Sequence, residues 1–375
     1  MIGIGVIGFG WMGRVHTQAY TRVSHHYADA PPIRLVAVAD DVPGRAGEAA
    51  DRYGFLSSTP DWRELVDDPR IQAVSITVPN FLHREVGVAF AAAGKHIWIE
   101  KPVGLSADDA RAIQGPGQVT VGFNYRNAPA VEKARELVAS GAIGTVTHAR
   151  FRFFSDYAAH PDGALSWRFQ REKGGNGVLG DLGAHGVDLI RHLLGEIDSL
   201  VADTATFVEE RPRPAAATAG HERGTGQLGP VENEDYFGAL LRMASGAKVV
   251  LEASRVAVAE QNNYGFEIHG TAGALFWDFR RMGELGVGTG SSYQDEPVRT
   301  LFVGPFDGEY GAFQPGAGTA MSYDDLKVIE AHRFLRSIAD GAPRGAGLAD
   351  AVRSAEALDA MSRSAETGTW IKLPR

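Results

Sequence analysis

Short apolar runs alternate with helix-like stretches through the first third of the chain. The runs rich in β-branched residues are 2–7, 34–39, 73–78, 96–100 and 119–123, with a weaker run near Phe55. The stretches with helical spacing between them are 12–23, 44–53, 81–93 and 107–114. This alternation is typical of βαβ units. It predicts an α/β fold whose N-terminal domain, residues 1–124, is a Rossmann-type, doubly wound parallel sheet.

The pattern changes after Phe123, where longer alternating segments replace the short apolar runs. The predicted strands are 146–154, 200–208, 235–243, 248–255, 264–269, 274–277 and 298–303. The predicted helices are 129–141, 180–194, 323–340 and 348–366. Many strands with few helices indicate an α+β domain, residues 125–375, built on a large mainly antiparallel sheet. The segment 209–230 has few large apolar residues, so we expect a loop there.

Composition limits the kinds of partner that this chain can have. It has 375 residues, is 44% hydrophobic and carries a formal net charge of −9, with no basic run and no cysteine. These values favour small-molecule partners over nucleic acid or a membrane surface, and they exclude disulfides and thiolate chemistry. The N-terminus lacks the pattern of a secretory signal and no apolar run is long enough to span a bilayer. We therefore expect a cytoplasmic protein.

A glycine-rich turn follows the first predicted strand and opens the first predicted helix. Its residues are Gly8, Phe9, Gly10, Trp11, Met12 and Gly13. Three glycines alone are weak evidence, but a strand before them and a helix after them direct backbone N–H groups at a pyrophosphate. The turn therefore predicts a dinucleotide site.

An acidic residue at the end of the second strand is the other half of this fingerprint, and Asp40 has that place. A carboxylate there accepts hydrogen bonds from a ribose 2′-hydroxyl and repels a 2′-phosphate, and Asp41 adds a second negative charge. We expect NAD as the cofactor. Arg14 and Arg45 are close enough in sequence to leave NADP as an alternative.

Polar residues follow two later strands, at the sheet edge where open α/β sheets bind ligands. The first group is Pro79, Asn80 and His83, and the second is Glu100 and Lys101. A buried charge at a strand end is costly unless it is paired or used. Lys101 is therefore a candidate functional ammonium, with a simple surface ion pair as the alternative.

A glycine-rich stretch, 174–183, leads into Asp181 and His185. If one α-helix begins near Gly180, these two side chains lie one turn apart and form an acid–base pair. Asp188 and His192 continue the series, so spacing alone leaves a metal site and ordinary helix-surface pairs open. The acid–base interpretation, which we follow, needs no metal.

In this order, the motifs resemble the glucose-fructose oxidoreductase / inositol dehydrogenase (Gfo/Idh/MocA) family of nicotinamide-dependent oxidoreductases. The resemblance extends over essentially the whole chain. It implies that Lys101 orients the substrate hydroxyl, that His185 is the general acid/base, and that Asp181 binds substrate and tunes the pair. Residues implied near the cofactor are Pro79, Asn80, His83, Glu100, Lys101 and Arg168. Residues implied around the substrate are Lys101, Asn124, Tyr125, Arg126, Asp156, Tyr157, Trp167, Asp181 and His185.

Within the family, the chain is most similar to sugar and cyclic-polyol dehydrogenases, including the inositol and anhydrosugar branches. The expected reaction is hydride transfer from a secondary hydroxyl carbon to NAD. One alternative keeps NAD tightly bound and uses transient oxidation to cleave a glycosidic bond. Another is a ligand-sensing regulator, against which the joint presence of Lys101, Asp181 and His185 argues. Family members commonly pair their sheets between subunits, so we expect a homodimer or homotetramer.

Overall fold

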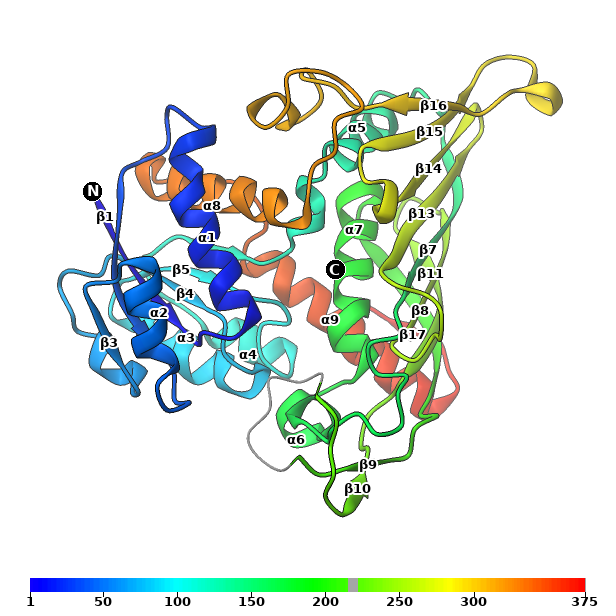
Figure 1. Ribbon diagram of the computed structural model, residues 1–375. Helices are drawn as coiled ribbons and strands as arrows, with labels where there is room; N and C mark the ends of the chain where they lie inside the picture. Colours follow the sequence, from blue (N-terminus) through cyan, green and yellow to red (C-terminus); the bar gives the residue numbers. More distant parts are fainter. Residues whose placement is uncertain (215–221, 375) are drawn as a thin grey trace. The chain divides into compact units, whose positions relative to one another are not determined.

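The computed structural model describes residues 1–214 and 222–374, which form two compact units (Figure 1). The first unit contains Met1–Asn124, Glu172–Gly175 and Tyr323–Ala355. The second contains Tyr125–Arg171, Asn176–Ser322 and the chain from Glu356 onward. Both units are therefore discontinuous in sequence. The sequence predicts one division of the chain, after residue 124, and this domain boundary stays a prediction.

The first unit is built on a parallel sheet whose described strands run in the order β3-β2-β1-β4-β5-β6. These strands are β1 (Ile2–Ile7), β2 (Ile33–Ala39), β3 (Ser57–Thr59), β4 (Ala73–Ile76), β5 (His96–Ile99) and β6 (Val119–Val121). The order reverses beside β1, which creates a switch point at the carboxyl edge of the sheet. The predicted Rossmann-type sheet is confirmed, including the weak strand after Phe55.

Helices α1 (Trp11–His26), α2 (Arg45–Tyr53), α3 (His83–Ala92) and α4 (Ala107–Ala112) connect the strands of this sheet. A further helix, α8 (Tyr323–Asp340), comes from far along the chain and packs beside α1 (Figure 1). Its inner face buries Leu326, Ile329 and Phe334 completely. Helix α9 (Leu348–Thr367) begins in the first unit, and its residues from Glu356 belong to the second.

The second unit contains a nine-stranded sheet among its described residues, in the order β16-β15-β14-β13-β7-β12-β11-β8-β17. Its strands are β7 (Val146–Phe154), β8 (Ile197–Ala205), β11 (Tyr236–Met243), β12 (Lys248–Ser254), β13 (Asn263–Gly270), β14 (Gly273–Asp278), β15 (Glu284–Thr289), β16 (Arg299–Phe302) and β17 (Ile371–Lys372). All neighbours are antiparallel except β7 and β12. The predicted large, mainly antiparallel sheet is confirmed, although the prediction missed β15.

Helices α5 (Pro129–Ala139) and α7 (Ala184–Leu194) pack against each other, and α7 lies on β7. On β7, Ala149, Phe151 and Phe153 are buried while the residues between them are more exposed. This period of two is the pattern of a sheet with one covered face. The short helix α6 (Arg171–Gly174) precedes the glycine-rich stretch.

Two predictions in this unit need correction. The stretch predicted as one helix, 180–194, begins with a π-helical turn, Leu179–Gly183, before α7 starts. The segment predicted as a loop, 209–230, contains a two-stranded ladder of β9 (Glu210–Pro212) and β10 (Leu228–Pro230), while its residues 215–221 lie outside the described residues. Within the described chain, no helix combines the length and hydropathy that crossing a bilayer requires.

Candidate functional site

The three glycines of the first turn have different surroundings. Gly8 has a φ of +85°, which only glycine adopts readily. A Cβ on Gly13 would lie 2.2 Å from the carbonyl oxygen of Gly8, so this glycine allows the helix to pack closely on the turn. A Cβ on Gly10 would meet nothing within 4 Å. Gly10 therefore leaves its backbone open to a ligand.

The beginning of helix α1 has the properties of an anion site. Its N-cap residue, Gly10, offers no side-chain hydrogen bond, and no acidic residue lies in the first turn. The first N–H groups of a 16-residue helix therefore point outward with the positive end of the helix dipole. Trp11 is 60% exposed and stacks on Tyr323, whose hydroxyl also contacts the sulfur of Met12. These features fit a bound pyrophosphate.

Asp40 is held in place at the end of β2. Its Oδ2 accepts a 2.6 Å hydrogen bond from the N–H of Phe9, and its Oδ1 accepts one of 3.0 Å from Val42. Arg45 approaches both oxygens, at 3.3 and 3.4 Å, while Asp41 is exposed. The carboxylate thus joins the glycine turn to the second strand, where the fingerprint places a ribose contact.

Residues after β1, β4, β5 and β6 lie along one edge of the sheet because these neighbouring strands are parallel. The glycine turn follows β1, Pro79 and Asn80 follow β4, and Glu100 and Lys101 follow β5. The Asn80 amide donates to the carbonyl of Gly174 at 3.2 Å. The first unit therefore gathers most of the predicted cofactor residues at one sheet edge.

His83 is buried and faces two carbonyl oxygens. Its Nδ1 lies 2.7 Å from the oxygen of Pro102, and its Nε2 lies 2.8 Å from that of Val78. Burial lowers the pKa of His83, against the two carbonyl contacts, which raise it. The imidazole links the turn after β4 to the turn that carries Lys101, so it supports both; its predicted contact with the cofactor stays a prediction.

Asn124, which follows β6, has a fully buried side chain. Neither its Oδ1 nor its Nδ2 makes a hydrogen bond within the described part of the chain. A buried amide in this state costs about 1–3 kcal/mol for each unmatched group. This cost is removed when a ligand with a matching donor and acceptor binds, which fits the prediction that Asn124 contacts a ligand.

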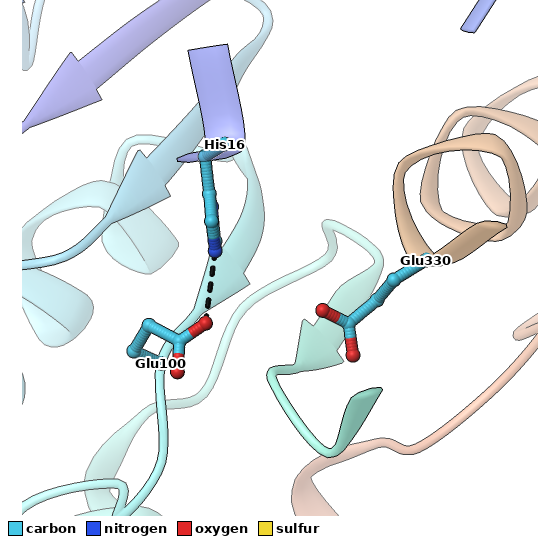
Figure 2. Close-up of side chains that lie close together, drawn as sticks. All are labelled: His16, Glu100 and Glu330. Carbon is cyan, nitrogen blue, oxygen red and sulfur yellow. Dashed lines mark hydrogen bonds and ion pairs between the residues drawn. The ribbon is translucent and has the colours of Figure 1, made fainter. Parts of the chain in front are cut away.

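Glu100 belongs to a buried ionic network that the sequence did not predict. Its Oε1 lies 2.9 Å from Nε2 of His16 and 2.5 Å from Nζ of Lys327 on α8. Lys327 also donates to Glu330 at 2.8 Å, and Glu330 accepts from the indole of Trp98 at 3.1 Å. Figure 2 shows the His16 imidazole directed at Glu100, with Glu330 reaching toward them from α8.

The charged groups of this network shift one another's pKa values. Burial alone would raise the pKa of Glu100, but Lys327 and His16 hold it well below its usual range. Burial raises the pKa of Glu330 to about 7, although Lys327 acts in the opposite direction. Burial lowers the pKa of His16 to about 4. Lys327 stays charged because the two glutamates, which raise its pKa, outweigh its desolvation.

His16, Glu100 and Glu330 also place one ligand atom each within 4.8 Å of one another, as a metal site would. The ammonium of Lys327, however, donates to both carboxylates. It supplies the positive charge that a metal ion would bring, so the cluster is an ion-pair network.

In the second unit, the hydroxyl of Tyr157 donates to Oδ2 of Asp181 at 2.6 Å. Burial and the neighbouring carboxylate raise the pKa of Tyr157 well above its usual value, so its proton stays on the phenol. Asp181 lies in the π-helical turn, which leads directly into α7 and His185. The predicted pairing of these two side chains and their roles stay predictions.

His185 lies in an aromatic environment on α7. The ring of Tyr125 meets it edge-on with centroids 4.7 Å apart, and Phe153 lies at 6.2 Å. The hydroxyl of Tyr264 donates to the carbonyl of His185 at 2.7 Å. The residue is buried, with 8% of its surface exposed.

Arg126 pairs with Asp188, and its predicted place near the substrate stays a prediction. Its Nε and Nη2 donate to both oxygens of the buried Asp188, at 2.5 to 2.9 Å. This bidentate pair joins the start of the second unit to α7, and it accounts for Asp188, which spacing alone left open as a metal ligand.

Trp167 and Arg168 lie in a short 3₁₀ helix, Trp167–Phe169, and the guanidinium of Arg168 stacks on Trp167 at 4.5 Å. Nη1 of Arg168 is buried and makes no hydrogen bond within the described residues, which leaves it able to bind a ligand oxygen. Asp156 accepts from Gln261 at 3.1 Å. The predicted substrate residues of the second unit therefore come from the 3₁₀ helix Asn124–Asn127, the segment that follows β7, the 3₁₀ helix of Trp167, the π-helical turn and α7.

Two family descriptions match this chain. Residues 2–115 match "Oxidoreductase family, NAD-binding Rossmann fold", and residues 131–276 match "GFO/IDH/MocA C-terminal domain". The levoglucosan dehydrogenase of Pseudarthrobacter phenanthrenivorans is 37% identical over 100% of this chain and 98% of its own length. The inositol 2-dehydrogenase of Rhizobium meliloti is 30% identical over 90% of this chain and 97% of its own.

Solved structures give the same result. A levoglucosan dehydrogenase in complex with NADH and levoglucosan matches with a TM-score of 0.93 at 35% identity, covering 100% of both chains. Its similarity to this chain therefore extends through both units.

Proposed function

This chain belongs to the GFO/IDH/MocA family of NAD-binding oxidoreductases, and we propose that it oxidises a secondary hydroxyl of an anhydrosugar or a closely related sugar. That it is an NAD-dependent dehydrogenase of sugars or polyols follows from its dehydrogenase relatives and the NADH complexes among them. The observation that carries the narrower proposal is the 37% identity to a levoglucosan dehydrogenase over the whole chain.

In the proposed reaction, the substrate hydroxyl loses its proton as its carbon loses hydride. His185 accepts that proton, because an imidazole titrates near neutrality and can alternate between acid and base. Lys101 donates to the same oxygen and stabilises the charge that develops there. NAD supplies the hydride acceptor when it is bound.

Asp181 and Tyr157 bind the neighbouring hydroxyls of the sugar. The carboxylate accepts from a hydroxyl, and the 2.6 Å bond from Tyr157 keeps one of its oxygens in a fixed direction. A sugar can satisfy these polar groups, whereas an apolar alcohol would leave them unpaired at a cost of about 1–3 kcal/mol each. The site therefore favours substrates with several hydroxyls.

The test is a reduction screen with NAD⁺ and NADP⁺ over anhydrosugars, inositols and aldoses at alkaline pH. We expect NADH to form with an anhydrosugar, and His185→Ala or Lys101→Ala to abolish turnover while NADH still binds. Turnover that survives both substitutions would remove the proposed roles. The absorbance of NADH is followed during turnover. Cleavage of a glycosidic bond with no net formation of NADH would instead favour the alternative with tightly bound NAD.

Three further expectations belong to this proposal. The first is that residues 1–124 hold the dinucleotide and residues 125–375 bind substrate. The second is that the nine-stranded sheet pairs with that of a second copy in a homodimer or homotetramer. The third is that the enzyme works in the cytoplasm. Leu240 and Phe302, exposed by 51% and 54% on this sheet, support the second expectation. Light scattering that gives a monomer mass would contradict it.

A further inference from the structure

Arg211 is fully buried although it lies in β9, within the segment whose composition predicts a loop. Burial lowers the pKa of its guanidinium, so this position is costly for the fold. Two backbone carbonyls accept its hydrogen bonds: Nη2 donates to Ala158 at 2.5 Å and Nη1 donates to His160 at 3.1 Å. Arg211 therefore binds the turn that directly follows Tyr157.

The same guanidinium also stacks on an aromatic ring. Its Cζ lies 4.2 Å from the centroid of Phe169, and Cζ of Arg255 lies 4.6 Å from the same centroid. Phe169 packs with Ala158 and Leu165, and Tyr157 packs against that cluster. The two arginines therefore hold a ring that connects the Tyr157 segment to the 3₁₀ helix bearing Arg168.

Arg255 is itself rigidly held. It pairs with the buried Asp235 at 2.8 Å and donates to the side chain of Asn233 at 2.9 Å. The amide of Asn233 in turn donates to the carbonyl of Arg168 at 2.8 Å. Arg255 thus fixes one side of Phe169, and Arg211 completes the arrangement from β9.

The turn after Tyr157 leaves room for the Arg211 side chain and is hydrogen-bonded to β9. A Cβ on Gly163 would lie 2.8 Å from Nη1 of Arg211, so this glycine leaves the space for the guanidinium. The N–H of Leu165 donates to the carbonyl of Pro212 at 2.8 Å, which ties β9 to the same turn.

We propose that Arg211 is a positioning residue for the sugar site: it fixes the 158–160 backbone and Phe169, and so holds Tyr157 against Asp181. The inference rests on the proposed function, in which Asp181 contacts the sugar. Only a guanidinium offers diverging donors and a flat face together; a lysine supplies the charge without this geometry.

The experiment compares Arg211→Met and Arg211→Lys with the control Arg213→Met, in which an exposed arginine two residues away is replaced. In full-length enzyme we expect Arg211→Met to raise the sugar KM about tenfold or more, with the Kd of NADH within about twofold of wild type. The sugar KM of Arg211→Lys should fall between those of wild type and Arg211→Met. The sugar KM of Arg213→Met should match that of wild type.

Hydrogen–deuterium exchange of the 155–165 segment gives a readout that needs no turnover. We expect faster exchange there in both Arg211 variants and not in Arg213→Met. Unchanged exchange in the Arg211 variants overturns the proposal, as does an Arg211→Lys enzyme with wild-type KM, because charge alone would then suffice. If faster exchange is seen but the wild-type protein oxidises no sugar, the positioning role stands and the proposed function fails.

Discussion

Oδ2 of Asp40 accepts a hydrogen bond of 2.6 Å from the N–H of Phe9, so one carboxylate both closes the glycine turn and faces the expected ribose. The turn and the cofactor preference are therefore linked through a single side chain. Arg45, which touches the same carboxylate, would be released if Asp40 were replaced.

Replacement of Asp40 by serine should shift the enzyme toward NADP. The substitution removes a charge that repels a 2′-phosphate and frees Arg45 to bind one. We expect the ratio of kcat/KM for NAD⁺ to that for NADP⁺ to fall about 100-fold. The control is Asp41→Ser, which removes an exposed neighbouring charge and should change this ratio far less. An unchanged ratio in Asp40→Ser would place the ribose elsewhere.

Alanine at Gly10 and at Gly13 should have opposite signatures. At Gly13 the new Cβ meets backbone at 2.2 Å, so the turn must move and the melting temperature should drop. At Gly10 the Cβ meets nothing within 4 Å, so stability should be retained while NADH binding weakens about tenfold or more. Thermal unfolding and fluorescence titration with NADH measure the two effects. Full NADH affinity in Gly10→Ala would show that no phosphate approaches there.

Replacement of Tyr157 by phenylalanine should slow sugar oxidation. A hydrogen bond to a charged group contributes about 1.5–3 kcal/mol, which corresponds to about a tenfold to hundredfold loss in kcat/KM for the sugar. Tyr236→Phe is the matched control, because Tyr236 also donates to a carboxylate, Glu252, at 3.1 Å but lies on the large sheet. Equal effects of the two substitutions would exclude a specific role for Tyr157.

The buried network should make stability depend on pH through Glu330. Its pKa is raised to about 7 in the folded protein, so folding binds a proton between its usual value and about 7, and this residue lowers stability as pH rises through that range. His16, with its pKa lowered to about 4, acts in the opposite direction between about 4 and its usual value.

Glu330→Gln should remove the contribution of Glu330 and leave that of His16. We therefore expect the melting temperature of the variant, relative to wild type, to rise between about pH 5 and about pH 8. Glu366→Gln, which replaces an exposed glutamate on α9, is the control. A constant difference between Glu330→Gln and wild type over this range would show that Glu330 is ionised throughout.

Local features were predictable from the sequence. Gly8, Gly10 and Gly13 belong to the glycine-rich turn that joins one strand to one helix. Residue type and order are therefore enough to predict this turn. Asp40 was predictable for the same reason, because it ends the strand next to β1. Short apolar runs in the first third of the chain predicted the parallel sheet. Alternation with a period of two in the rest of the chain predicted the mainly antiparallel sheet.

Features that depend on distant contacts were not predictable. Lys327 lies 227 residues from Glu100, and nothing in its helix distinguishes it from a surface lysine. The π-helical turn around Asp181 escaped prediction because apolar spacing does not separate it from an α-helix. A Cβ on Gly183 in this turn would lie 3.0 Å from the ring of Phe237, a contact that only the folded chain reveals. Arg211 was hidden by the polar, small-residue composition of its segment.

Helix α8 has a consequence for how the protein is made. The dinucleotide-binding sheet ends at Val121, yet the ammonium that neutralises Glu100 is supplied by Lys327. A ribosome that has released only the sheet has exposed a nascent chain whose buried carboxylate still lacks its counter-charge. Completion of this unit therefore waits until α8 has emerged, and an N-terminal sheet transplanted into another gene without this late helix would lack the ammonium that pairs with Glu100.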